Sequence, residues 1–334
     1  MKKQTQLLFT SHQALGSDPE FFFVKDNKVV PSSEVISDDE HNDEDTPVIR
    51  DGFQGELNPS AHPCRQVSGA YVGRALLDAV RIAKRSGATI SLDVGHIISD
   101  DVWKKTSTDM KRFGCNPTLT AYRANAERVT GLREKFRAGG GHLHFGLANP
   151  AGVDCGKLVK VMDIVVGNTC VLFDRDINNA RRRKNYGRAG EYRLKSYGVE
   201  YRVLSNFWLR SYTLWSMVTA LGRNAIGIYT SGLADELIAK VDMRKIRKAI
   251  NYNDYDLALK NFTVLKEFLV EHNATGNGLD VVRLKGFTKW ATSEQPLEEW
   301  NTMDKVIKGW TTYTRGQVSQ GLERYLDNNY DNPN

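Results

Sequence analysis

In the first 210 residues the spacing of apolar side chains switches between a period of two and a helical period. Alternation with a period of two predicts strands, and apolar residues three and four positions apart predict one face of a helix. Asp26 and Asn27 predict a turn between the first two strands, and Gly87 predicts a helix end. The expected elements are strands over 20–24, 28–30 and 89–94 and helices over 71–85 and 154–174.

From residue 206 onward the pattern is almost entirely helical. Helices are expected over 207–229, over 244–271 with a break near Asn251, and over 297–326, followed by a polar tail that frays. We therefore expect a core that mixes strands and helices over residues 1–208. The remainder, 209–334, is expected to form a helical extension that packs on this core instead of folding independently.

One low-complexity segment interrupts the N-terminal part. Residues 38–45 contain six acids in eight positions. Like charges at this density repel each other, so the segment is expected to be a solvated loop, with metal binding as the alternative.

Three strand-like segments each place two strongly polar residues two positions apart, and a fourth adds a weaker pair. Residues i and i+2 of a strand point to the same face, so each pair is expected to project to one side. The solvated face of an amphipathic strand would look the same for any single pair. The pairs are Asp18 with Glu20, His142 with His144, Glu200 with Arg202, and Glu56 with Asn58.

Together these segments supply four carboxylates and two imidazoles. Oxygen-rich donor sets prefer hard divalent ions, so Mg²⁺ or Mn²⁺ is expected, shared with substrate phosphates. A zinc ion on the two histidines alone is the alternative.

The 334 residues carry a formal net charge of +6, from 46 Lys and Arg against 40 Asp and Glu. Residues 181–202 contain eight cations and two acids, so this short segment accounts for the whole excess. Arginine matches phosphate oxygens with two parallel hydrogen bonds, and glycines near Tyr186 let the backbone approach an anion. A basic loop that binds RNA, or nothing, is the alternative interpretation.

The four cysteines are widely spaced and form no CxxC pair. They are expected to be reduced thiols of a cytoplasmic protein. The apolar run near the N-terminus is too short for a signal peptide, and no run is long enough to span a bilayer.

Several segments resemble the phage-type COOH·NH2 ligases (type 2 amidoligases), a branch of the glutamine synthetase and glutamate–cysteine ligase superfamily. Residues 16–22, 141–144 and 200–202 are similar to the acid-Pro-Glu-Phe, HxH and ExR strands of glutamine synthetases. The segments typical of the phage branch are DGFQGELNP, FGCNP, GGGHLHFG and, most specifically, residues 186–208.

This resemblance, over roughly residues 14–210, implies an α+β fold in which a curved antiparallel sheet forms a funnel, flanked by helices. It implies an ATP-dependent ligase that forms an amide through an acyl phosphate, in the host cytoplasm if a phage encodes the chain. The carboxylate and amine substrates, small molecules or peptides, stay open, and the superfamily's habit of assembling allows a homo-oligomer.

The resemblance also implies two or more divalent metal ions and roles for individual residues. Glu20 and Glu56 would hold a metal near the acceptor, with Asp51 as a candidate third ligand. A second metal, bridging the ATP phosphates, would be held by Asp18, His142 and Glu200. Arg202 would stabilise the moving phosphoryl group together with catalytic Glu200, and His144 would orient the substrate. The ATP site would be formed by Arg181, Arg182, Arg183, Tyr186, Arg188, Arg193 and Arg202.

Departures from the pattern limit the comparison with glutamine synthetases. Asp18 stands where they usually have Glu, and their glutamate- and ammonia-binding segments have no recognisable counterpart. Cys115 is interpreted as a packing or turn residue because no base lies near it in the sequence. A two-metal phosphoester hydrolase or a nucleic-acid-binding protein would use many of the same residues, and both stay as alternatives.

Overall fold

A computed structural model of the chain describes residues 14–43, 46–112, 118–127, 134–272 and 284–319. The expectations for the N-terminal apolar run, for Cys115 and for the polar tail lie outside the described residues.

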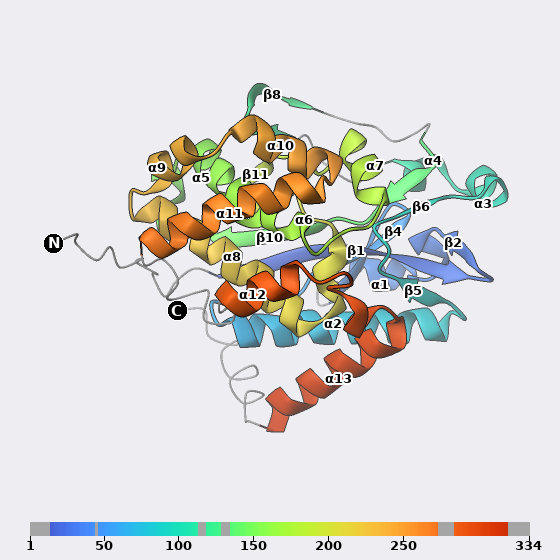
Figure 1. Ribbon diagram of the computed structural model, residues 1–334. Coiled ribbons are helices and arrows are strands. Elements are labelled where there is room, and N and C mark those ends of the chain that lie inside the picture. Colours follow the sequence, from blue (N-terminus) through green and yellow to red (C-terminus); the bar gives the residue numbers. More distant parts are fainter. Residues whose placement is uncertain (1–13, 44–45, 113–117, 128–133, 273–283, 320–334) are drawn as a thin grey trace.

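The fold is α+β and is built on a ten-stranded antiparallel sheet (Figure 1). Eight strands follow the order β3-β4-β1-β10-β12-β11-β7-β8, and β2 and β5 both pair with β1. Because β3 and β8 are the two ends of this order, the sheet is open. The bounds are β1 Leu15–Lys25, β2 Lys28–Val30, β3 Val48–Asp51, β4 Gln54–Leu57, β5 Thr89–Ser91, β7 Thr118–Thr120, β8 Arg123–Glu127, β10 Gly141–Gly146, β11 Glu191–Lys195 and β12 Gly198–Tyr201. A separate two-stranded sheet consists of β6 Gly95–Ile97 and β9 Phe136–Ala138.

The helices follow in chain order and become dominant after β12. They are α1 Asp38–Asn42, α2 Arg65–Arg85, α3 Asp100–Lys105, α4 Thr108–Lys111, α5 Cys155–Met162, α6 Asn168–Val171, α7 Asn178–Asn185, α8 Tyr212–Thr230, α9 Ala234–Lys240, α10 Met243–Tyr252, α11 Tyr255–Glu271, α12 Leu284–Ala291 and α13 Met303–Ser319. A π-helical turn, Asp163–Gly167, joins α5 to α6. None of these helices combines the length and the apolar character needed to cross a membrane.

Most predicted elements exist, with shifted bounds. The turn at Asp26 and Asn27 is confirmed, and both residues adopt the left-handed conformation with φ of 50° and 59°. The strand before it begins at Leu15, earlier than predicted. The break in the helix over 244–271 is also confirmed, and it lies at Asn253, which has a φ of 53°.

The acidic segment differs from its prediction, because residues 38–42 form the short helix α1 instead of a loop. Ser37 caps the helix: its hydroxyl accepts from the Glu40 amide, and the Glu40 carboxylate accepts from the Ser37 amide. Arg50 and Arg85 pair with Asp38 and Glu40, which relieves the repulsion on which the loop prediction depended.

The two faces of the sheet have different roles. Leu143, Phe145 and Val199 belong to the main hydrophobic core, which α5, α8, α10 and α11 complete. In Figure 1, α10 and α11 lie above the strands, α8 lies below β10, and α2 and α13 lie side by side at the bottom. The helices after residue 208 thus share one core with the sheet. The division at residue 208 and the funnel shape stay predictions.

Gly222 of α8 lies directly against the sheet. A methyl group at this position would come within 2.1 Å of the ring of Phe145, so Gly222→Ala overpacks the core. We expect this change to lower the free energy of unfolding by about 1–3 kcal/mol in a denaturant titration. Gly309→Ala in α13, where nothing lies within 4 Å, is the matched control and should raise stability by up to about 1 kcal/mol. Equal effects at both positions would contradict the packing of α8 on β10.

Candidate functional site

The register of the central strands brings the predicted polar pairs to one region of the sheet. In the β1–β10 pair Asp18 lies opposite His142, and in the β10–β12 pair His144 lies opposite Glu200. Glu20 lies opposite Glu56 in the β1–β4 pair. These side chains are on the face opposite to Leu143 and Val199, so the helical layer does not cover them.

Three acids form one cluster on β1, β3 and β4. Glu20, Asp51 and Glu56 each offer a carboxylate oxygen, and these oxygens lie within 4.8 Å of one another. Burial, together with the charges of Asp51 and Asp18, raises the pKa of Glu20 to about 8. Burial and the charge of Asp18 also raise the pKa of Asp51 to about 6, and burial and four neighbouring acids raise that of Glu56 to about 10. The cluster is therefore short of positive charge.

A second cluster lies beside the first and includes both histidines. The His142 Nδ1 is 2.8 Å from one Asp18 oxygen, and the His144 Nε2 is 3.1 Å from the other. Burial raises the pKa of Asp18, but the histidines outweigh it and hold this pKa well below its usual range. Asp18, His144 and Glu200 place ligand atoms within 4.8 Å of one another, and His142 Nδ1 is 3.6 Å from Glu200.

The donor sets of both clusters fit hard divalent cations. The first cluster offers only carboxylate oxygens, and their mutual repulsion is what a dication would remove. In the second cluster His142 is buried, and its Nε2 has no hydrogen-bond partner within the described residues. Together the two clusters include every residue predicted to bind metal, and also Asp51 and His144.

Three cations surround Glu200, which is fully buried. The Arg202 Nε is 3.0 Å from one carboxylate oxygen, and Arg193 Nη1 and Lys195 Nζ are 3.2 and 3.1 Å from the other. Burial raises the pKa of Glu200, but His142 and Arg202 lower it below its usual value overall. One carboxylate facing three cations leaves a positive surplus at the edge of the second cluster.

The other predicted phosphate ligands contact the protein itself. Arg182 is buried and donates to the carbonyls of Val203 and Leu204, at 2.9 and 2.7 Å. Arg181 lies over the ring of Phe136. Arg183 donates to Asn253 Oδ1, Arg188 donates to the carbonyl of Arg183, and Tyr186 stacks edge-on against His142. Their role toward ATP stays a prediction.

A cavity of about 340 Å³ lies beyond Arg202, on the side away from the acid clusters. Thr118 connects Arg202 with this cavity, because it accepts a hydrogen bond from Arg202 Nη1 at 2.7 Å and also lines the cavity. The cavity contains one acid, Glu191, against five cations. The cations are Arg123, Arg183, Lys184, Arg188 and Arg247.

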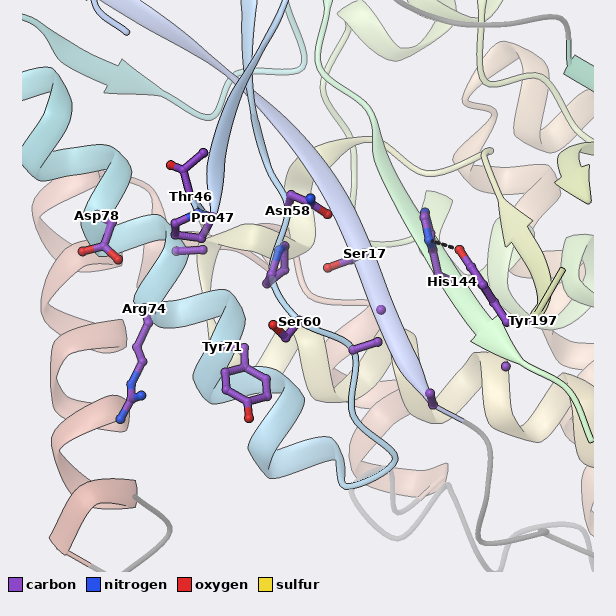
Figure 2. A pocket seen from close by; sticks show the side chains of 16 residues that line it. Ser17, Thr46, Pro47, Asn58, Ser60, Tyr71, Arg74, Asp78, His144 and Tyr197 are labelled. Atoms are coloured by element: carbon purple, nitrogen blue, oxygen red, sulfur yellow. Dashed lines mark hydrogen bonds between the residues drawn. The ribbon is translucent and has the colours of Figure 1, made fainter. Parts of the chain in front are cut away.

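A larger cavity, of about 880 Å³, opens at the other end of the site (Figure 2). His144 and Tyr197 form its boundary with the second cluster, and the Tyr197 hydroxyl is 2.6 Å from His144 Nδ1. Figure 2 shows this pair on one side and Tyr71, Arg74 and Asp78 of α2 on the other.

Sequence reasoning missed some participants. Thr118 belongs to no motif, Tyr197 lies in the family segment 186–208 without a predicted role, and Lys195 was only one cation among eight. The amide of Gly140 donates to Glu20 Oε2 at 2.7 Å, and a methyl group at Gly140 would come within 2.5 Å of the Tyr186 hydroxyl. The run of three glycines before His142 was the available signal for this close backbone approach.

Residues 121–253 match the family model of phage phiEco32-like COOH·NH2 ligase-type 2. This match confirms the family resemblance predicted from the sequence, and it supports a ligase of a carboxylate and an amine. The matched range includes His142, His144, Glu200 and Arg202, while Asp18, Glu20 and Glu56 precede it. No curated protein matches the chain.

Proposed function

We propose that this protein is an ATP-dependent ligase that joins a carboxylate to an amine through an acyl-phosphate intermediate. The observation that carries the proposal is the order of charges across the sheet. Acids lie on β3, β4 and β1, histidines on β10, and cations on β11 and directly after β12, at Arg202. The two signs meet at Glu200 on β12. A triphosphate chain bound through divalent cations needs this sequence of groups.

Two metal ions fit the donor sets. Glu20, Asp51 and Glu56 would hold one ion, and Asp18, Glu200 and a histidine would hold the other. When bound, such ions neutralise phosphate oxygens and polarise the phosphoryl group. The cavity of about 340 Å³ is the proposed place of the nucleoside, because its cations and Thr118 lead directly to Arg202.

The chain's own residues then position the reactants and stabilise charge. A substrate carboxylate oxygen forms a bond to the γ-phosphorus, and the bond to the β–γ bridging oxygen breaks, releasing ADP. Arg202 lies where negative charge develops on the equatorial oxygens, and its contact with Glu200 holds its orientation. The guanidinium also lies 5.2 Å from the centre of the Tyr186 ring, which restricts it further.

The second step forms the amide. The amine nitrogen attacks the acyl carbon, phosphate leaves, and the nitrogen loses a proton. His144 borders the large cavity and is held between Asp18 and Tyr197, so it is the residue we place to orient the amine. Phosphate, ADP, the amide and the proton lost from the nitrogen account for all atoms of the reactants.

Nucleotide use tests the proposal. Purified protein with Mg²⁺ and ATP should release ADP only when both a carboxylate and an amine are supplied. Mass spectrometry of a cell extract treated in this way should show products lighter by one water than the sum of two components. A two-metal hydrolase, the second candidate, would cleave phosphoesters such as bis-p-nitrophenyl phosphate without ATP, and that result would overturn the ligase.

A further inference from the structure

The large cavity exists because two neighbouring segments of the sheet separate for a short distance. β1 pairs with β4 at Glu20 and Glu56, and it meets the same segment again only at the bridge between Leu15 and His62. Between these two pairings β1 advances by five positions, from Glu20 to Leu15, while the other segment advances by six, from Glu56 to His62. The other segment therefore contains one extra residue. Residues 58–61 bulge away from Ser17, and Pro59 within them has no N–H to donate.

Ser17 faces this gap with an unsatisfied hydroxyl. The residue is 4% exposed and lines the cavity, and its Oγ has no hydrogen-bond partner within the described residues. Figure 2 shows the hydroxyl directed toward the segment that carries Asn58. Buried polar groups are nearly always hydrogen-bonded, so a hydroxyl left free beside a cavity indicates a partner that binds there.

The lining of the cavity is mostly neutral and hydrogen-bonding. Its charged residues are Arg74 and Asp78, and Asp78 also pairs with Arg81 on the same helix. A free amino acid carries its two charges close together and has no amide, whereas a peptide separates its two terminal charges by neutral amides. The neutral polar groups instead match the amides of a peptide. They are Ser17, Thr46, Asn58, Ser60, Tyr71 and Tyr197.

Size favours the same class of substrate. Cavities of about 300–1,000 Å³ usually hold drug-sized molecules, and this one has about 880 Å³. A peptide of a few residues fills such a space better than a single amino acid does. At one end of the cavity His144 contacts Asp18 of the second cluster, and at the other end Tyr71, Arg74 and Asp78 of α2 form the wall.

We propose that this cavity binds a short peptide as a substrate of the ligase, and that the Ser17 hydroxyl hydrogen-bonds one of its amides. The inference rests on the proposed function, because that reaction requires a substrate with a terminal carboxylate or amine. Peptides carry both groups, whereas a neutral oligosaccharide carries neither.

Binding is measured first without ATP or metal, by saturation-transfer difference NMR. The probes are a mixed tripeptide library, the twenty free amino acids, and maltotriose. The library should show transfer to backbone amide and Cα protons, and the other probes should show much less. Transfer to free amino acids alone, or to maltotriose alone, would overturn the peptide proposal.

Variants then test Ser17 itself. Ser17→Val should abolish transfer to the peptides, and Ser17→Ala should raise the KM for a peptide substrate about tenfold with kcat little changed, as expected for one hydrogen bond. Ser216→Ala is the matched control, because Ser216 in α8 is equally buried, also has an unpartnered Oγ, and lines none of the described cavities.

The outcomes separate the two proposals. If peptides bind in a Ser17-dependent manner but no ADP forms with any amine or carboxylate, the ligase fails and the peptide site stands. If ADP forms with free amino acids and neither Ser17 variant changes the KM, the ligase stands and the peptide site fails. Unaltered circular dichroism of both Ser17 variants shows that a loss of binding or a rise in KM does not come from unfolding.

Discussion

Glu200→Gln is expected to lower metal- and ATP-dependent product formation by at least about 100-fold while the protein stays folded. Glu200 is the point where the second cluster and the cations meet, with contacts to His142, Arg193, Lys195 and Arg202. Glutamine preserves the shape of the side chain and removes its charge. The donor set then loses a carboxylate, and three cations lose their common partner.

The measurement combines ADP release with Mn²⁺ titration followed by electron paramagnetic resonance. The matched control is Glu298→Gln, which removes an exposed acid that accepts a hydrogen bond from Asn301 and belongs to neither cluster. This control should leave both readouts unchanged. Unchanged ADP release in Glu200→Gln would refute the metal and phosphate assignment, whatever the change in stability.

Arg202→Lys should show the second large effect, a loss of about 1,000-fold in kcat with a much smaller change in the KM for ATP. The guanidinium contacts Glu200 through Nε and Thr118 through Nη1, which fixes its plane. Lysine keeps the positive charge but cannot make both contacts, so it cannot hold the charge at the transferring group. Arginines that stabilise phosphoryl transfer contribute about 10³–10⁵ to the rate in other enzymes.

Arg210→Lys provides the comparison for Arg202. Arg210 is also largely buried and its guanidinium donates to the carbonyls of Trp300 and Leu92, but it lies outside the site. Single-turnover kinetics should separate the two variants, with a slow chemical step in Arg202→Lys alone. Equal losses in both would mean that a buried arginine matters here for stability and not for catalysis.

The faces of the strands could be predicted from the sequence, but the neighbours of each strand could not. Spacing of two residues correctly predicts that Asp18 and Glu20 share one side. The spacing does not predict that Glu20 lies opposite Glu56, because this pairing depends on tertiary contacts between segments that are distant in the sequence. The family resemblance supplied that information for the metal ligands.

Other features depend on packing that no local pattern contains. Arg182 belongs to the most basic stretch of the sequence, yet it is buried and bonded to backbone carbonyls. Asp38 belongs to the most acidic stretch, yet it lies in a helix because arginines from elsewhere pair with that segment. A dense run of charges in the sequence predicts that the segment binds an oppositely charged ligand or faces water. It does not tell whether the charged side chains instead pair with other groups of the same protein.

The bulge at residues 58–61 allows the shape of the large cavity to change without a change in the strand register that pairs Glu20 with Glu56. The paired acids Glu20 and Glu56 lie on one side of it, and the bridge between Leu15 and His62 closes the sheet on the other. Residues can therefore be inserted into or removed from the bulge while both anchor points keep their register. Because residues 58–61 line the large cavity, a change in the length of this loop would alter the cavity without moving Glu20 or Glu56 out of register.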